Sequence, residues 1–500
     1  MNQTIPPSSR VQDILGTLAG FAFFATLVFM PLRWRSVLLA RPNGTVYADY
    51  TDFLLFLPDI ALTATLLLWG LARWTRRDPL QFGPAYIWVP LAGLTVTGAL
   101  SVVVSVDRAL SLYHTIRLAL LFLFYLYLVN EPIFLPMIGA AIGLQGALQA
   151  EVAITQSILQ RSVGLQAFGE YELDPLWSGI SIVSDGTTRF LRAYGLSDHP
   201  NILGGCLAFG LAVLLAAYLR GGWKNSVALA ILFAWLCAAL LLTFSRAAWL
   251  AFFAGAGLML GMDAWAYRSQ NLKPVLLLAL GMSLVVSPFI AANSQYLGAR
   301  LNVGNSFENN PAEKLSIVGR AFLNESANRI FVKYPLTGVG LSASPVAMKN
   351  EYPEFPMNYQ PPHFALLVVA LETGIFGAAF YFLLMALPWI VLLRRRQMWS
   401  NPNVIGAAGL LLAVTVVGFF DYYTWSSTPG RLWQWLAWGL FAAAMESSLI
   451  PVPSTAGGRE SASPIGVERG ASGNEAGRRA RGEEVPPLPS GEGRGGGGSI

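Results

Sequence analysis

The chain has 500 residues, of which 54% are hydrophobic and only 12% are charged. Soluble domains carry roughly 25% charged residues, so the composition excludes an ordinary soluble protein and indicates lipid as the main solvent. The net charge of +5 comes from basic residues scattered between apolar segments, which excludes a nucleic-acid-binding patch. Cys206 and Cys237 both fall inside apolar segments, so they offer neither a disulfide framework nor metal-ligand spacing.

Apolar segments long enough to cross a bilayer recur along most of the chain. A helix needs about 20 mostly apolar residues to cross the hydrocarbon core. Twelve segments satisfy this, at about 14–32, 52–72, 85–105, 109–129, 132–152, 200–219, 226–244, 247–267, 273–292, 372–393, 403–421 and 431–450. The sequence therefore predicts an all-α fold, a polytopic membrane bundle of about twelve transmembrane helices. The first segment is long for a signal peptide and lacks a cleavage site, so we expect it to be retained.

The short connections predict the orientation of the bundle. With the N-terminus inside, the inner connections are rich in basic residues, namely Arg73, Arg76, Arg77, Arg220, Lys224, Arg268, Lys273, Arg394, Arg395 and Arg396. Basic residues favour the cytoplasmic side, although Arg33, Arg35 and Arg41 run against this rule. We therefore expect both termini in the cytoplasm and two long connections outside, at about 153–199 and 293–362. The second is a large outer loop between the ninth and tenth helices.

The last fifty residues differ from the rest of the chain. Residues 451–500 contain no aromatic residue, are rich in Gly and Pro, and carry six Arg and six Glu that cancel. Such a segment cannot bury enough apolar surface to fold alone. The predicted organisation is a polytopic membrane domain over 1–450 and a disordered cytoplasmic tail over 451–500.

Charged groups at the predicted membrane boundary are the first functional candidates, because a charge at a helix centre costs about 2.5 kcal/mol or more. Arg192 precedes the sixth helix, and it could either reach lipid phosphates or bind an anionic substrate. Arg246 lies in the tight turn before the eighth helix, where an anion would relieve its unfavourable position beside the helix dipole. Alternatively, its side chain could simply extend to the membrane interface. Asp198 is the predicted N-cap of the sixth helix.

Two further candidates lie where the long loop re-enters the membrane. His363 follows Pro361 and Pro362, and a neutral imidazole can take a proton from a hydroxyl near neutral pH. The alternative is an interfacial histidine with no role. Glu372 lies nine residues further on, about 13 Å along a helix and on its opposite face. It could pair with an arginine such as Arg246, or it could orient the loop.

Five short motifs follow one another on the predicted outer face. They are Arg-Ala-Tyr-Gly-Leu-Ser-Asp-His-Pro-Asn at 192–201, Thr-Phe-Ser-Arg-Ala-Ala at 243–248, Tyr-Pro-Leu-Thr-Gly-Val-Gly at 334–340, Pro-His at 362–363 and Leu-Glu-Thr-Gly-Ile-Phe-Gly at 371–377. In this order they resemble the O-antigen ligase and polymerase superfamily, which includes bacterial O-linked oligosaccharyltransferases. The resemblance covers about 100–395 and is strongest from 190 to 380.

The resemblance implies a membrane glycosyltransferase. The family moves a glycan from an undecaprenyl-diphosphate carrier to a hydroxyl acceptor, such as lipid A-core or a growing polysaccharide, at the outer face of the cytoplasmic (inner) membrane. It needs no nucleotide sugar, cofactor or metal. By resemblance Arg192 and Arg246 hold the donor diphosphate, His363 activates the acceptor hydroxyl, and Arg320 corresponds to an arginine of the family's outer loop. Glu372 is expected to contribute to substrate binding.

The sequence departs from the family pattern at two places. Phe364 follows the histidine where the family usually has Asn, and no Trp occurs shortly after Arg320. Ligase, polymerase and protein glycosylase share the motifs and differ in the acceptor, which could be a lipid, a glycan or a protein. We expect the acceptor to contact the loop 293–362, and the sequence leaves these three activities open.

Three other classes of function remain as alternatives. A transporter or flippase of a lipid-linked or anionic substrate would use charged residues near mid-bilayer and short outer loops, whereas these candidates cluster at the outer boundary beside two long loops. A glycosyltransferase of a different membrane architecture would carry a large acidic loop after the first helix, and here that connection is short. A non-enzymatic membrane scaffold is the third.

Overall fold

The computed structural model describes residues 7–131, 135–184, 187–221, 227–267, 271–301, 311–356 and 358–447, and most of them are helical. In chain order the elements are α1 (Pro7–Phe29), β1 (Arg35–Leu39), β2 (Phe53–Phe56), α2 (Leu57–Arg76), α3 (Ala85–Val104), α4 (Arg108–Asn130), α5 (Leu135–Leu159), β3 (Ile182–Ser184), β4 (Arg189–Leu191), α6 (Pro200–Leu219), α7 (Val227–Leu242), α8 (Arg246–Tyr267), α9 (Leu272–Ala292), α10 (Ser294–Leu301), α11 (Pro311–Lys333), α12 (Ser344–Glu351), α13 (Ala365–Arg394), α14 (Pro402–Phe420), α15 (Tyr423–Ser426) and α16 (Thr428–Ser447). The predicted tail 451–500 lies outside the described residues.

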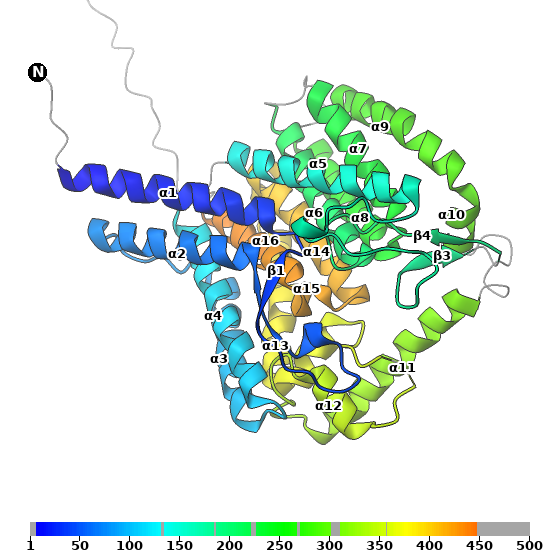
Figure 1. The fold of residues 1–500 in the computed structure, drawn as a ribbon. Coiled ribbons are helices and arrows are strands. Elements are labelled where there is room, and N and C mark those ends of the chain that lie inside the picture. The colour runs from blue at the N-terminus through cyan, green and yellow to red at the C-terminus, as the bar shows by residue number, and fades with distance from the viewer. Residues whose placement is uncertain are drawn as a thin grey trace, which may run out of the picture. The chain divides into compact units, whose positions relative to one another are not determined.

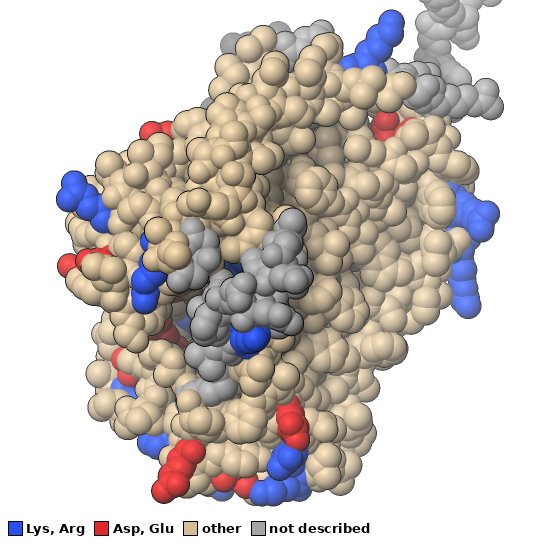
Figure 2. Space-filling model, turned by 90° about the vertical axis from the view of Figure 1, so that its right-hand side faces the viewer, with Lys and Arg blue, Asp and Glu red and all other residues tan. Residues whose placement is uncertain are grey.

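Within the described ranges, nine helices are long and apolar enough to cross a membrane, namely α1, α3, α4, α5, α6, α8, α9, α13 and α14. The helix α7 is apolar but shorter. A helix also occupies each remaining predicted span, and these two, α2 and α16, carry more polar residues. Most of the face in Figure 2 is free of charged side chains, which gather along its rim and in its lower half. The protein is therefore a multi-pass helical membrane protein, and the count of twelve spans stays a prediction.

Two small antiparallel ribbons accompany the helices, and the sequence did not predict them. Strand β1 pairs with β2 in the connection after α1, and β3 pairs with β4 in the connection before α6. Residues 53–56, predicted as the start of the second span, are β2 instead. Figure 1 shows both ribbons beside the helix bundle. Such short strands in loops carry too little apolar alternation to be recognised.

The described residues of the predicted outer loop 293–362 are largely helical. The loop contains α10, α11 and α12, and the last two pack against each other and against α13. Their apolar contacts form a small separate core that includes Leu323, Ile330, Val339, Met348 and Tyr359. The helices α11 and α12 therefore form a structured cap on α13 (Figure 1).

Two of the recognised motifs bind each other. The segment Tyr334–Gly340 runs along residues 371–375 of α13, where backbone hydrogen bonds join them: Val339 N to Leu371 O (2.9 Å), Gly340 N to Glu372 O (3.0 Å) and Ile375 N to Pro335 O (2.8 Å). These bonds use backbone groups that an unbroken helix would use internally. Sequence segments about 35 residues apart are thereby locked together.

Glycines make this docking possible. Gly374 has φ 71° and ψ −172°, which breaks α13 and is a conformation essentially reserved for glycine. A Cβ at Gly374 would lie 2.2 Å from Leu336 O, and one at Gly338 would lie 2.5 Å from the carbonyl carbon of Glu372. Because no side chain fits at either position, the glycines of the motifs set the approach of the cap to α13.

Candidate active site

A cavity of about 310 Å³ lies where the N-terminal ends of α6 and α13 meet the C-terminal end of α14. Its Arg, His and Asp lining residues are Arg192, His199, Arg300, Arg320, His363 and Asp421. Three of the residues expected to form the site, Arg192, Arg320 and His363, therefore share one space, although they lie up to 171 positions apart in the chain. The lining contains three guanidinium groups and one carboxylate, so the cavity suits an anionic ligand.

The guanidinium of Arg192 is held rigidly at the edge of this cavity. Its side chain is buried, with only 5% exposed. Nε donates to Thr243 O at 2.7 Å, and Nη2 donates to Asn201 Oδ1 at 2.6 Å. Thr243 belongs to the motif at 243–248 and Asn201 ends the motif at 192–201, so the two motifs meet through this side chain.

A chain of polar contacts continues from Arg192 to the histidine. Asn201 Nδ2 donates to Asp421 Oδ2 at 2.9 Å. The other carboxylate oxygen, Oδ1, lies 3.4 Å from His363 Nδ1, which is ion-pair distance once the imidazole is protonated. The order is therefore Arg192, Asn201, Asp421 and His363, and it connects the cationic edge of the cavity with its imidazole.

Asp421 is ionised at neutral pH. Burial alone would raise the pKa of this carboxyl, but its contact with His363 and the nearby charge of Arg320 outweigh burial and hold the pKa below its usual range. Tyr422 N also donates to Oδ1 at 2.9 Å. A fixed carboxylate beside an imidazole stabilises the imidazolium that forms when the ring accepts a proton.

The orientation of His363 is set by its neighbours. Its backbone N donates to Asn324 Oδ1 at 2.8 Å, and its ring packs edge-on against Tyr422 with ring centroids 5.0 Å apart. Pro361 and Pro362 are buried, so the entry to α13 is stiff. Because Nδ1 faces Asp421, we assign the proton of the neutral ring to Nδ1, which leaves Nε2 free to act as a base.

His199 has a structural role in the same cavity. It is the N-cap of α6, since Nδ1 accepts from Asn201 N at 3.0 Å, and its Nε2 lies 2.8 Å from Ser181 Oγ. Burial lowers the pKa of His199 to about 3, so the ring is neutral. The prediction that Asp198 caps this helix is wrong, because Asp198 instead pairs with Arg33 (2.8 Å) and Arg35 (2.6 Å).

The structure does not bring Arg246 or Glu372 into the lining of this cavity. Arg246 Nη1 donates to the backbone oxygen of Arg300 at 3.3 Å, so it contacts a residue that lines the cavity. Glu372 is buried and accepts hydrogen bonds from Ser344 Oγ (2.8 Å) and Trp425 Nε1 (2.9 Å). Glu372 therefore holds the cap and α15 together.

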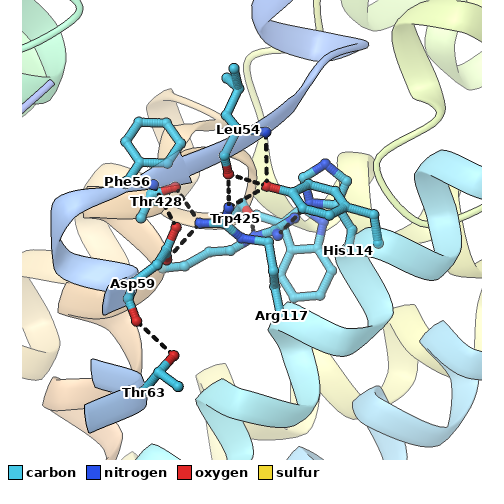
Figure 3. A network of polar contacts seen from close by, with 10 residues as sticks. Leu54, Phe56, Asp59, Thr63, His114, Arg117, Trp425 and Thr428 are labelled. Carbon is cyan, nitrogen blue, oxygen red and sulfur yellow. Dashed lines mark hydrogen bonds and ion pairs between the residues drawn. The ribbon is translucent and has the colours of Figure 1, made fainter. Parts of the chain in front are cut away.

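A buried polar network lies next to α15, and Figure 3 shows it around Arg117. Arg117 Nη2 donates to Asp59 Oδ1 at 2.9 Å and to Thr428 Oγ1 at 2.7 Å, while Nη1 donates to Leu54 O at 3.0 Å. These contacts join α4, β2, α2 and α16. Arg117, a charged residue within the predicted span 109–129, is thus paired inside the protein.

Arg431 extends this network toward the cavity. Its guanidinium donates to Trp425 O, to Ser342 Oγ at 2.9 Å and to His114 Nδ1 at 3.2 Å. An arginine is always a donor, so His114 accepts here and carries its proton on the other nitrogen. The network fixes α15, and α15 directly follows Asp421 and Tyr422, which line the cavity.

A second, apolar cavity of about 580 Å³ opens beside the histidine. Its lining is Leu250, Ala254, Asn324, His363, Phe364, Val416, Phe419 and Phe420. The rings of Phe364 and Phe419 stack with centroids 6.1 Å apart. Among these residues only His363 also lines the polar cavity, so its side chain lies at the boundary between the polar cavity and the apolar one.

The sequence did not predict three residues that line the polar cavity, namely Asn201, Arg300 and Asp421. Asp421 had a usable signal, because it is a carboxylate at the end of a predicted span and the cost of charge near lipid applies to it as well. Asn201 ended a recognised motif, but nothing in the sequence tells which side chain it meets. In the described part of the chain, no cluster of three or more His, Cys, Asp or Glu residues could hold a metal ion.

Comparison with known proteins identifies one family. Residues 231–382 match the family model of the O-antigen ligase, which is just under a third of the chain. No curated protein matches the chain. The match contains Arg246, Arg320, His363 and Glu372, while Arg192 lies before it and Asp421 after it. The predicted resemblance to the O-antigen ligase and polymerase superfamily is confirmed over the matched residues.

Proposed function

We propose, from the match of residues 231–382 to the O-antigen ligase family, that this multi-pass membrane protein transfers glycans in the assembly of a cell-envelope polysaccharide. The donor is a glycan on an undecaprenyl-diphosphate carrier, and the acceptor is a hydroxyl group at the outer face of the cytoplasmic membrane. The observation that carries the proposal is the convergence of Arg192, Arg320 and His363 on one cavity.

The arginines account for the donor diphosphate. A guanidinium forms charge-assisted and often bidentate hydrogen bonds with phosphate oxygens. Arg192 is pre-organised by Thr243 and Asn201, so little side-chain entropy is lost when it binds. As the glycosyl bond breaks, negative charge grows on the diphosphate, and positive groups already in place stabilise that transition state more than the ground state.

The apolar cavity accounts for the carrier lipid. It lies between α8, α13 and α14 and contacts His363 at its edge. A polyprenyl chain in this space would place its diphosphate at the neighbouring charged cavity. The carrier chain already lies in hydrocarbon, so the cavity offers it packing contacts rather than release from water. These contacts would position the lipid tail while the sugar remains at the polar side.

His363 and Asp421 account for the acceptor. The acceptor oxygen attacks the anomeric carbon, its proton passes to Nε2 of His363, and the carbon–oxygen bond to the diphosphate breaks with both electrons leaving on the carrier. Asp421 stabilises the imidazolium that forms. The products are the glycosylated acceptor and the free carrier diphosphate. By analogy with the family, we expect a single displacement with inversion at the anomeric carbon.

The acceptor class stays open within this proposal, and lipid A-core, a growing polysaccharide and a protein hydroxyl each fit the chemistry. The cap formed by α11 and α12 borders the cavity through Gly319, Arg320 and Leu323, so it is the part of the protein that we expect to meet the acceptor. We further propose, from the distribution of basic residues between the helices, that both termini lie in the cytoplasm.

The direct experiment uses purified full-length protein, an undecaprenyl-diphosphate glycan and a panel of acceptors, with products identified by mass. We expect transfer by the wild type and a loss of at least about a hundredfold in His363→Ala, because general-base catalysis typically contributes 10²–10⁴-fold. The variant should still insert into the membrane. Unchanged turnover by His363→Ala would remove His363 as the base, and absence of transfer to every acceptor by the wild type would reject the proposed reaction.

A further inference from the structure

A third cavity lies at the far end of the bundle from the candidate active site. Its volume is about 730 Å³, within the range of about 300–1,000 Å³ typical of ligand sites. It is bounded by α4, α5, α6, α14 and α16. The helix α6 lines the active-site cavity with Asn201 and Ile202 near its start. It lines this cavity only from Val213 onward, about 16 Å further along at 1.5 Å per residue. The two cavities are therefore separate.

This cavity has a polar mouth and an apolar interior. Its polar residues stand at helix ends or in connections, namely Gln81, Asn130, Glu131, Arg220, Asn403 and Glu446. One or two turns deeper along the same helices, the lining becomes apolar, with Val213 on α6, Leu410 on α14 and Leu440 on α16. A ligand that fits must combine a polar head with an apolar chain, as a membrane lipid does.

The charged residues at the mouth of the cavity indicate which lipid headgroup it can bind. Glu131 is already engaged, because it accepts from Trp69 Nε1 at 2.8 Å and lies 3.9 Å from Arg73. Arg220 is exposed and its guanidinium donates to the side chain of Asn403, which leaves other donors for a ligand. Glu446 is half-buried, and within the described residues it makes no ion pair. One cation and one acid thus remain for a ligand.

We infer that this cavity binds a zwitterionic aminophospholipid, with an acyl chain among the apolar residues and an ethanolamine headgroup at the mouth. Arg220 binds the phosphate and Glu446 accepts a hydrogen bond from the ammonium group. A purely anionic headgroup would meet the carboxylate of Glu446, and a choline headgroup has no N–H to donate. The inference does not depend on the glycosyl-transfer proposal, because the two cavities share no lining residue.

The test measures lipid binding to the purified full-length chain by native mass spectrometry. Phosphatidylethanolamine, phosphatidylcholine and phosphatidylglycerol with identical acyl chains are titrated separately. We expect phosphatidylethanolamine to bind about tenfold more tightly than the other two, the equivalent of one charge-assisted hydrogen bond. Equal binding of the three lipids, or tightest binding of phosphatidylglycerol, would overturn the proposal.

Four variants sharpen the test. Glu446→Gln should abolish the preference for phosphatidylethanolamine over phosphatidylcholine. Arg220→Gln should weaken the binding of phosphatidylethanolamine and of phosphatidylcholine by the same factor. Ala443→Phe should fill the cavity and displace the lipid from a folded protein. Glu354→Gln, an exposed residue outside the cavity, is the matched control and should bind like the wild type. A retained preference in Glu446→Gln, or unchanged binding in Ala443→Phe, would contradict the assignment.

Discussion

At the scale of single residues, the site depends on pairs that are distant in the chain. His363 and Asp421 are 58 positions apart, and Asn201 and Asp421 are 220 apart. The sequence pointed to His363 and Arg192 because each is costly at a membrane boundary and each belongs to a recognised motif. It could not point to their partners, because no local pattern states which distant side chains will meet.

His199 offers a prediction about pH. Burial lowers the pKa of His199 to about 3, whereas an imidazole in an unfolded chain titrates near 6.5. As the pH falls below 6.5 the unfolded state takes up a proton first, so this contribution to stability is complete above pH 6.5 and is lost toward pH 3. At pH 5 the loss amounts to about 2 kcal/mol in the free energy of unfolding.

The variant His199→Asn removes the titration while keeping a capping side chain, since Asn is a good N-cap. We expect its unfolding free energy to fall by about 2 kcal/mol less than that of the wild type between pH 7 and pH 5. Denaturant titration followed by tryptophan fluorescence measures both proteins. Parallel pH profiles for the two proteins would show that His199 does not carry this acid sensitivity.

At the scale of elements, the break in α13 connects the cap to the bundle. Gly374 interrupts the helix, and the segment Tyr334–Gly340 fills the gap with its own backbone hydrogen bonds. Both segments were recognised as motifs, but the sequence predicted no role for their glycines. The positive φ at Gly374 and the close approach at Gly338 are three-dimensional facts that a single sequence does not reveal.

We predict that Gly374→Ala destabilises the protein by about 3 kcal/mol or more. The φ and ψ of Gly374 cost a non-glycine residue roughly 1–3 kcal/mol, and its Cβ would also lie 2.2 Å from Leu336 O. Gly257→Ala in α8 is the matched control, since a Cβ there meets nothing within 4 Å. Equal unfolding midpoints for the two variants would show that the break does not depend on glycine.

At the scale of the whole molecule, the positions of the helices were the most predictable feature. Each predicted span overlaps a helix, because apolar length is a local property of the sequence. The structured cap was not predicted, since α11 and α12 lie among polar and irregular segments and obtain their stability from packing. The membrane orientation is predicted from the distribution of basic residues between the helices.

Cysteine labelling tests that orientation. Residue 310, the obvious loop position from the sequence, lies outside the described residues, so Glu354 on the cap and Gln397 after α13 are better choices because both are exposed. We expect an impermeant maleimide to label Glu354→Cys from outside spheroplasts and Gln397→Cys only after permeabilisation. Native Cys206 and Cys237 are buried and should give little background. The reverse pattern would invert the topology.

The most direct test of the central claim is donor affinity, measured separately from turnover. The claim is that the arginines hold a lipid-linked diphosphate beside His363. Binding of an undecaprenyl-diphosphate glycan to purified wild type, His363→Ala and Arg192→Ala is measured without acceptor. We predict that His363→Ala binds like the wild type, and that Arg192→Ala binds at least about tenfold more weakly through loss of charge-assisted hydrogen bonds. The double variant Arg192→Ala/Arg320→Ala is measured in the same way. If this double variant bound the donor as tightly as the wild type does, the account would be contradicted.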